Sequence, residues 1–452
     1  MSFPRYPAYK DSGVTWLGEV PSHWSLLKLK HIATFSGGGT PSRDNPDYWS
    51  GDIPWVSPKD MKTEQLTGAE ESITATGLAN STASLVPPNR LLMVVRSGIL
   101  KHTIPVAINQ LQVTLNQDMK ALDFADEGLT SSFFLRWVQG LNDLLLLEWA
   151  KQGATVESIE HEYLANTVVP LPTASERATI TSFLDREAAK IDSLVAEQEQ
   201  LITVLKEKRQ AVISHAVTKG LDPSVPMKDS GVEWLGEVPA HWKVMPIRLA
   251  ARLESGHTPS RSRPDWWLDC TVPWFSLADV WQIREAGRDV VYETKEMVSE
   301  LGLANSSARL LPKGTVMLSR TASVGFAAIM GVDMATTQDF ANWVCGQSLL
   351  PEFLLDTFKA MKPEFNRMMM GSTHNTIYMP DIQAFRFALP SMNEQAQIVA
   401  YVRDATAQSD ELIAEAKAAV SLLKERRSAL ISAAVTGQID VRGLAPAQEQ
   451  AA

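Results

Sequence analysis

Two short loops carry residue types that can hold a polyanion. They read Gly-Thr-Pro-Ser-Arg at 39–43 and His-Thr-Pro-Ser-Arg at 257–261. Arginine can clasp a guanine edge with two hydrogen bonds or hold a phosphate, and Ser or Thr hydroxyls can do either more weakly. The candidate contact residues in these loops are Thr40, Ser42, Arg43, Thr258, Ser260, Arg261 and Arg263.

A purely structural role competes with this interpretation. Aromatic residues follow each loop (Tyr48, Trp49, Trp266 and Trp267), and they could fill a core beneath a rigid turn. A second set of candidates begins at the ends of two predicted strands, 91–96 and 315–320. It consists of Arg96, Lys101, His102, Arg320 and Thr321.

The sequence shows no catalytic motif. It contains no Walker A loop, and the glycines at 37–39 lack the spacing of a dinucleotide site. It also lacks the Asp-Pro-Pro-Tyr or Asn-Pro-Pro-Tyr loop with which adenine methyltransferases hold a flipped base. Cys270 and Cys345 form no metal-binding pattern, and we interpret His23 and His241 as turn residues packed by the tryptophans that follow them. We therefore predict no catalytic residue and no metal ligand.

A long helix is predicted from Thr173 to Thr218. Thr173 and Glu176 have the spacing of a capping box, and no Gly or Pro interrupts the segment. About 45 residues at about 1.5 Å each make a rod of about 65–70 Å. Its apolar residues follow a seven-residue repeat, so the helix needs a partner helix.

The partner is predicted in the same chain, at 391–436. Ser391 and Glu394 repeat the capping box 218 residues further on, and LKEKR at 205–209 becomes LKERR at 423–427. We predict an antiparallel coiled coil. Its predicted packing residues are Ile180, Leu184, Ile191, Leu194, Leu201, Leu205, Val212, Ile398, Val402, Leu412, Val420, Leu423 and Leu430.

The whole chain is a tandem duplication of one unit. The leading segment KDSGVTWLGEVPSHW at 10–24 returns as KDSGVEWLGEVPAHW at 228–242, again 218 residues on. GLANSTASLVPP at 77–88 corresponds to GLANSSARLLPK at 302–313, which is an offset of 225 residues. The second copy therefore carries a net insertion of seven residues. Leading segments and helices agree closely between the copies, whereas the regions between them agree only at scattered positions. Surfaces that read different targets need not match.

This pattern predicts an α+β protein with two mixed α/β domains in a pseudo-two-fold arrangement, joined by the two long helices. The predicted parts are an N-terminal arm (1–21), a first body (22–172), a first helix (173–219), a linker (220–239), a second body (240–390), a second helix (391–437) and a C-terminal tail (438–452). Each body is expected to hold short strands and an amphipathic helix, at 129–150 and at 349–369.

The amino-acid composition is typical of a globular protein and has more acidic than basic residues. Its 452 residues are 45% hydrophobic and carry a net charge of −10. No apolar run is long enough for a membrane span. The two cysteines suggest no disulfide framework, so a reducing cytoplasm is the expected location.

The doubled leading segments, the Thr-Pro-Ser loops and the capped helices resemble the specificity subunit of Type I restriction–modification enzymes. The match covers nearly the whole chain, and His257 in place of Gly39 is a small departure. The resemblance implies that each body is a target recognition domain for one half of a bipartite DNA site. It also implies that the helices fix the spacer between the half-sites.

The resemblance further implies the partners and the chemistry of the complex. Two methyltransferase subunits would dock on this subunit and methylate adenine with S-adenosylmethionine. Two motor-nuclease subunits would cut unmodified DNA in a reaction that needs ATP and Mg. None of these cofactors would belong to this chain, which by itself would be no enzyme.

The acidic balance bears on DNA affinity. Residues 22–170 hold 11 Lys and Arg against 16 Asp and Glu, and residues 240–390 hold 15 against 15. Because phosphate neutralisation dominates nucleic-acid affinity, we expect the isolated chain to bind DNA weakly. Three alternatives remain: an enzyme in its own right, a coiled-coil scaffold that binds protein only, and a DNA-reading subunit of another methylation-linked defence system.

Overall fold

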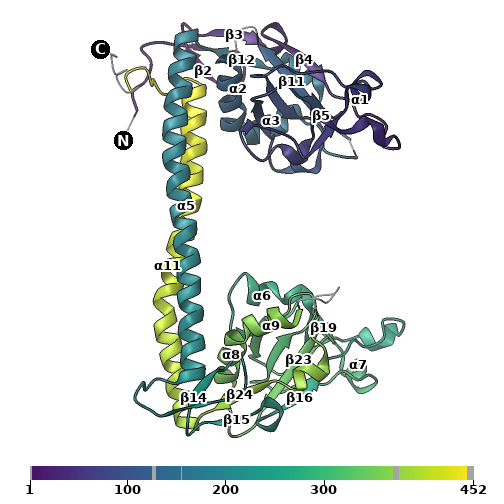
Figure 1. The fold of residues 1–452 in the computed structure, drawn as a ribbon, viewed down its shortest axis with the longest axis vertical. Helices are drawn as coiled ribbons and strands as arrows, with labels where there is room; N and C mark the ends of the chain where they lie inside the picture. Colours follow the sequence, from purple (N-terminus) through teal and green to yellow (C-terminus); the bar gives the residue numbers. More distant parts are fainter. Residues whose placement is uncertain (1–2, 125–128, 154, 370–375, 445–452) are drawn as a thin grey trace. The chain divides into compact units, whose positions relative to one another are not determined.

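The computed structural model describes residues 3–124, 129–153, 155–369 and 376–444. The chain divides into two compact units (Figure 1). Unit 1 comprises 1–198 and 418–452, and unit 2 comprises 199–417. Each unit contains one body and a stretch of both long helices. Of the predicted C-terminal tail, 445–452 lies outside the described residues.

The two long helices are α5 (Ala174–Lys219) and α11 (Met392–Val435). Both capping boxes form. The backbone N–H of Glu176 donates to Thr173 Oγ1 over 3.4 Å, and that of Glu394 donates to Ser391 Oγ over 3.3 Å. Each acid also accepts from the backbone N–H of its capping residue. The helices therefore begin where the reciprocal caps satisfy their free N–H groups.

Within each unit the two helices pack together in antiparallel order. In unit 2, Ile202 and Leu205 of α5 share a buried cluster with Ile413 and Ala416 of α11. An ion pair of 2.9 Å joins Arg209 Nε to Asp410 Oδ1 nearby.

Unit 1 contains the matching ion pair, in which Arg427 Nε lies 2.9 Å from Asp192 Oδ1. Ile180 and Leu184 of α5 share its core with Ile431 and Val435 of α11. The predicted fold class, two mixed bodies with two long helices that pack together, is confirmed.

The predicted helix packing is wrong at Leu194, Leu201 and Leu412, whose exposed fractions are 45%, 42% and 40%. On α5 the contact face instead includes Ile202, which is 9% exposed and lies in the cluster with Ile413 and Ala416. The prediction followed the large apolar residues, whereas small and polar residues occupy part of the real contact face. Among the other predicted packing residues, Ile180, Leu184, Ile191, Leu205, Ile398 and Val402 are buried, and Val212, Val420, Leu423 and Leu430 are half-buried.

The first body holds two sheets, of five strands (β4-β11-β8-β9-β6) and three strands (β10-β5-β7). The strands are β4 (Ala33–Gly37), β5 (Trp49–Val56), β6 (Gln65–Leu66), β7 (Glu71–Ile73), β8 (Leu91–Val94), β9 (Val106–Asn109), β10 (Thr114–Leu115) and β11 (Met119–Phe124). The helices are α1 (Ala75–Ala79), α2 (Leu129–Gly140), α3 (Asn142–Trp149) and α4 (His161–Asn166). A strand pair, β3 (Ser25–Lys28) with β12 (Val168–Leu171), leads into α5.

The second body repeats this topology, with sheets β16-β23-β20-β21-β18 and β19-β17-β22. The strands are β16 (Ala251–Ser255), β17 (Val272–Phe275), β18 (Val290–Val291), β19 (Glu296–Val298), β20 (Val316–Ser319), β21 (Ala327–Met330), β22 (Ala335–Thr336) and β23 (Phe340–Cys345). The helices are α6 (Trp281–Arg284), α7 (Glu300–Ala304), α8 (Pro351–Ala360), α9 (Lys362–Met369) and α10 (Met379–Gln383). The pair β15 (Lys243–Pro246) with β24 (Arg386–Leu389) leads into α11.

The structure differs from the predicted elements in two places. The single helices expected at 129–150 and 349–369 each form two helices, α2 with α3 and α8 with α9. A side chain at Gly140, where α2 ends, would lie 2.8 Å from the backbone N of Ser432, so glycine permits the close approach to α11. In the second body the net insertion contributes α6, for which the first body shows no counterpart among its described residues.

Each leading segment is a hairpin that is fastened to a long helix. The hairpins are β1 (Tyr9–Asp11) with β2 (Glu19–Pro21), and β13 (Met227–Asp229) with β14 (Glu237–Pro239). Behind them, His23 Nε2 lies 2.7 Å from Glu176 Oε1, and His241 Nε2 lies 2.7 Å from Glu394 Oε1. Burial raises the pKa of Glu394, but the hydrogen bonds from His241, Ser391 and Trp242 outweigh it and hold that pKa at about 2. The predicted turn histidines are therefore also hydrogen-bond partners of the capping glutamates.

The segment after α11 and the first leading segment meet in unit 1 in the same way as the segment after α5 and the second leading segment meet in unit 2. Gly220 and Gly437 both have φ of +75°, and each follows a long helix. Gly220 lies against Pro239 and Trp242, and Gly437 lies against Pro21 and Trp24. The two chain ends also meet through a hydrogen bond of 2.8 Å from Asp440 N to Pro4 O.

The contact face of the helix pair can be tested with two neighbouring residues. Ile202→Ala should lower the free energy of unfolding by about 2–3 kcal/mol, because it leaves a cavity in the cluster with Leu205, Ile413 and Ala416. Leu201→Ala is the matched control and should cost less than about 1 kcal/mol, because Leu201 is half-exposed. Equilibrium urea unfolding followed by circular dichroism measures both. Equal losses would show that the contact face is misplaced.

Candidate nucleic-acid interface

The two Thr-Pro-Ser loops adopt the same geometry in both bodies. Each begins at a glycine, Gly38 or Gly256, where a Cβ atom would lie about 2 Å from a neighbouring backbone carbonyl oxygen. In the first body the indole of Trp55 donates to Gly39 O over 2.8 Å, and that of Trp49 donates to Ser42 O over 3.0 Å. The backbone carbonyls of the loop are thus fixed by tryptophans from β5.

The second loop is fixed in the same way. Trp274 donates to His257 O over 3.3 Å, and Trp267 donates to Ser260 O over 3.2 Å. The hydroxyl of Ser260 also lies 2.8 Å from that of Ser262. For Trp49 and Trp267 the structural interpretation therefore holds, because their indoles fix the backbone of the loops.

The loop arginines lie over these tryptophans. The Arg43 guanidinium is 3.8 Å from the ring centroid of Trp49, and that of Arg261 is 4.0 Å from Trp267. Each arginine also pairs with a glutamate of the three-stranded sheet. Arg43 Nη2 donates to Glu71 Oε2 over 2.9 Å, and Arg261 Nη2 lies 2.6 Å from Glu296 Oε2.

Both arginines remain accessible, since their side chains are 52% and 60% exposed. The hydrogen bond with Arg43 lowers the pKa of Glu71 and raises that of Arg43. Both groups therefore stay charged at neutral pH. A guanidinium that is stacked and paired on one side still offers donors to a phosphate or a base.

The structure brings the two sets of candidates together at one turn in each body. Thr40 donates to the side chain of Gln117, and the next residue, Asp118, lies 2.6 Å from Arg96 Nε. In the second body Thr258 donates to Gln338 Oε1 over 2.8 Å, and Arg320 Nε donates to Gln338 O over 2.9 Å. Sequence reasoning missed this connection, although Gln-Asp recurs in both copies.

The remaining candidates lie at the edges of this arrangement. Lys101 is exposed, 3.6 Å from Glu157, and His102 follows it as the exposed end of the short helix η4 (Gly98–Lys101). Thr321 forms an isolated β-bridge with Thr376. Arg263 pairs with Asp265 over 2.8 Å beside the ring of Trp266. No solved contact with DNA assigns any of these candidates, and each remains a prediction.

Within the described residues, no group of three or more His, Cys, Asp or Glu side chains could hold a metal ion. No helix in the same part of the chain is long and apolar enough to cross a membrane.

The family model of the Type I restriction modification DNA specificity domain matches residues 21–203 and again 239–422. The chain belongs to this family. Each match covers one body and most of the long helix that follows it, so the internal duplication is a duplication of the specificity domain.

Curated relatives agree with this assignment. The chain is 34% identical over 184 residues to the specificity subunit of the Type I restriction enzyme EcoR124I/EcoR124II of Escherichia coli, an alignment that covers 40% of this chain and 44% of that subunit. It is 21% identical over 441 residues to the MjaIX specificity subunit of Methanocaldococcus jannaschii, which covers 95% and 96% of the two chains.

A structure solved in work on complex assembly and conformational transition of the type I R-M system superposes with a TM-score of 0.69. It covers 92% of this chain and 98% of that one at 16% identity, and so supports the fold.

The matched loops of the two specificity domains generate a prediction. Arg43→Ala and Arg261→Ala should each weaken DNA binding of the assembled complex without changing which bases are preferred, because the same residue in the same setting cannot distinguish two different half-sites. Selection from a random duplex library measures the preference, and Arg43→Lys and Arg261→Lys are charge-retaining controls. A changed base preference in either half-site would instead identify these arginines as base readers.

Proposed function

We propose that this chain is the non-catalytic DNA-reading subunit of a Type I restriction–modification complex, and that each body reads one half of a bipartite site. The observation that supports this most directly is the pair of specificity domains in one chain. The two bodies also differ in sequence, whereas the two leading segments are nearly identical. This difference supports the proposal, because two bodies that read different half-sites need different surfaces.

The chemistry of such a complex would lie in other subunits. Two methyltransferase subunits would bring S-adenosylmethionine and methylate adenine, and two motor-nuclease subunits would bring the ATP- and Mg-dependent cleavage. The long helices would provide their docking sites and would set the spacer between the half-sites. Basic surfaces of these partners would supply the phosphate contacts that an acidic chain lacks.

Modularity is the main test of this function. Replacing residues 22–170 with the body of another specificity subunit should change one half of the recognised site and leave the other half unchanged. The graft should keep an acid at Glu64 and an arginine at Arg136, because both make ion pairs with the long helices. Mapping methylated adenines across a host genome, with and without the swap, gives the readout. A swap that alters both half-sites, or neither, would count against the proposal.

The spacer provides a second test, because α5 runs without a break from unit 1 into unit 2. Four residues inserted beside Gln198 add roughly 6 Å of helix and return the contact face to within about 40°. Since B-DNA rises about 3.4 Å per base pair, the preferred spacer should grow by about one base pair, two at most. A two-residue insertion, which turns the face by about 200°, should abolish assembly. An active four-residue variant that keeps the original spacer would refute the role of helix length.

A further inference from the structure

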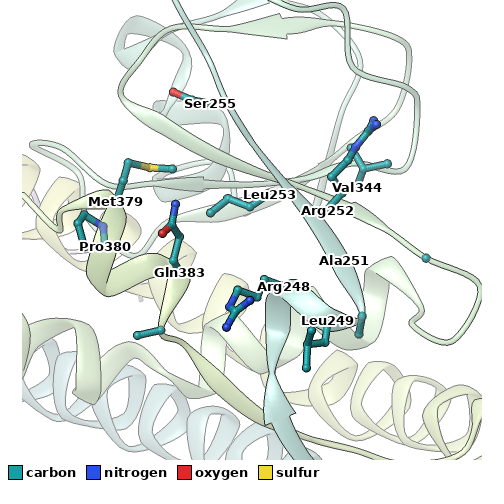
Figure 2. A pocket seen from close by; sticks show the side chains of 13 residues that line it. Arg248, Leu249, Ala251, Arg252, Leu253, Ser255, Val344, Met379, Pro380 and Gln383 are labelled. Atoms are coloured by element: carbon teal, nitrogen blue, oxygen red, sulfur yellow. The ribbon is translucent and has the colours of Figure 1, made fainter.

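The second body has an open groove beside the edge strand of its larger sheet. The groove has a volume of about 920 Å3. Its walls are the strand β16, the short helix η5 (Ile247–Leu249) that precedes it, and α10. Figure 2 shows Met379 and Gln383 on α10, Arg248 on η5 and Leu253 on β16.

The charge of the groove is opposite to that of the chain. Its lining contains Arg248 and Arg252 and no acidic residue, although the chain carries a net charge of −10. The exposed Arg248 side chain makes no ion pair or hydrogen bond within the part of the chain that the structure describes. Arg252 lies 3.1 Å from Glu254 and is still 69% exposed. Both guanidinium groups can therefore receive an anion from solvent.

The groove is not a general property of this fold, because the first body fills the corresponding space differently. There Phe35 stands in place of Leu253, and its ring meets His161 edge-on at 5.1 Å. Lys30, in place of Arg248, is tied to Asn166 Oδ1 over 2.8 Å. Thr34 stands in place of Arg252. The first body therefore has one cation at these two positions, Lys30, and this lysine is bonded to α4 through Asn166.

The strand that lines the groove leads along the chain into the loop that carries Arg261. Ser255 ends β16 and lines the groove, and the Thr-Pro-Ser loop begins two residues later. A strand of five residues spans about 17 Å, which equals the rise of about five base pairs. A DNA backbone that follows β16 would meet Arg248 first, then Arg252, and Arg261 at the far end of the strand.

We propose that this groove is a phosphate-binding track of the second body, in which Arg248 and Arg252 hold the DNA backbone beside the half-site that this body reads. The proposal rests on the proposed DNA-reading function. Planar guanidinium groups suit phosphate oxygens, and Gln383 offers a neutral donor on the wall formed by α10. The contacts are independent of sequence and would anchor the half-site without reading it.

The test uses the full chain assembled with its methyltransferase subunits. The double variant Arg248→Gln and Arg252→Gln should lower the slope of log affinity against log salt by about two, since each lost phosphate contact removes about 0.9. Affinity should fall about tenfold or more at low salt, by the same factor for the cognate duplex and for a duplex with a scrambled second half-site. The methylated positions should not change.

Two control variants separate this role from a general charge effect. Arg284→Gln with Arg367→Gln removes two other exposed cations of the same body, each paired with a neighbouring glutamate, and should leave the slope unchanged. Arg248→Lys with Arg252→Lys keeps the charge and should restore most of the affinity. A melting curve of the assembled complex shows whether each variant is folded.

Three outcomes would overturn the proposal. An unchanged salt slope in the folded glutamine variant would show that the groove does not hold phosphates. A loss confined to the cognate duplex would make these arginines base readers, and a failure to assemble would make the groove a docking site for another subunit. If the unaltered complex shows no preference for the cognate duplex, the proposed function itself fails, whatever the slope does.

Discussion

The burial of the contact face between α5 and α11 is the constraint on which the other features depend. Neither helix could keep its apolar stripe in water alone, and in each unit the stripe is covered by the other helix and by one body. The other contacts are arranged around this pairing. Leading-segment histidines bind the capping glutamates of both helices, and Gly140 brings the end of α2 against α11. Because a specificity domain contributes only one of the two helices, neither domain can complete its core without the other.

Each body carries a charged network beside the long helices, and the two networks differ in sign at one corresponding position. The network of unit 1 consists of Glu64, Arg136, Asp185 and Arg427, and that of unit 2 consists of Asp289, Asp356, Lys359 and Arg209. Arg209 and Arg427 correspond and come from the repeated LKEKR and LKERR runs. On the body helices, however, Asp356 stands where Arg136 stands in unit 1, and burial raises the pKa of Asp356 to about 6.

The duplication made most of the fold predictable, since two copies of one pattern show which residues recur with a fixed offset. The capping boxes at Thr173 and Ser391 fixed the helix starts to within one residue of those observed. The helix contact face was harder to predict because it contains small and polar residues. Arg209 pairs with Asp410 of the partner helix, and Ala416 lies in the cluster between the helices, whereas Leu194 remains exposed. The hydrophobicity of single residues could not show which residues form the contact face, because that depends on which side of the helix the partner helix covers. Hydrogen bonds such as that between His23 and Glu176 join residues 153 positions apart and had no local signal.

The candidate interface divides into parts that the two bodies share and parts that they do not. Arg43 and Arg261 share the stacked tryptophan, the glutamate and the fixed loop carbonyls. A contact that is the same in both bodies cannot tell two different half-sites apart, so these residues suit a common task such as holding a phosphate. Discrimination must then come from surfaces where the bodies differ, such as the region of α6, which only the second body contains within the described chain. The sequence could mark the shared residues because they recur. The sequence could not reveal the residues that discriminate between half-sites, because such residues differ between the two copies and so form no repeated pattern.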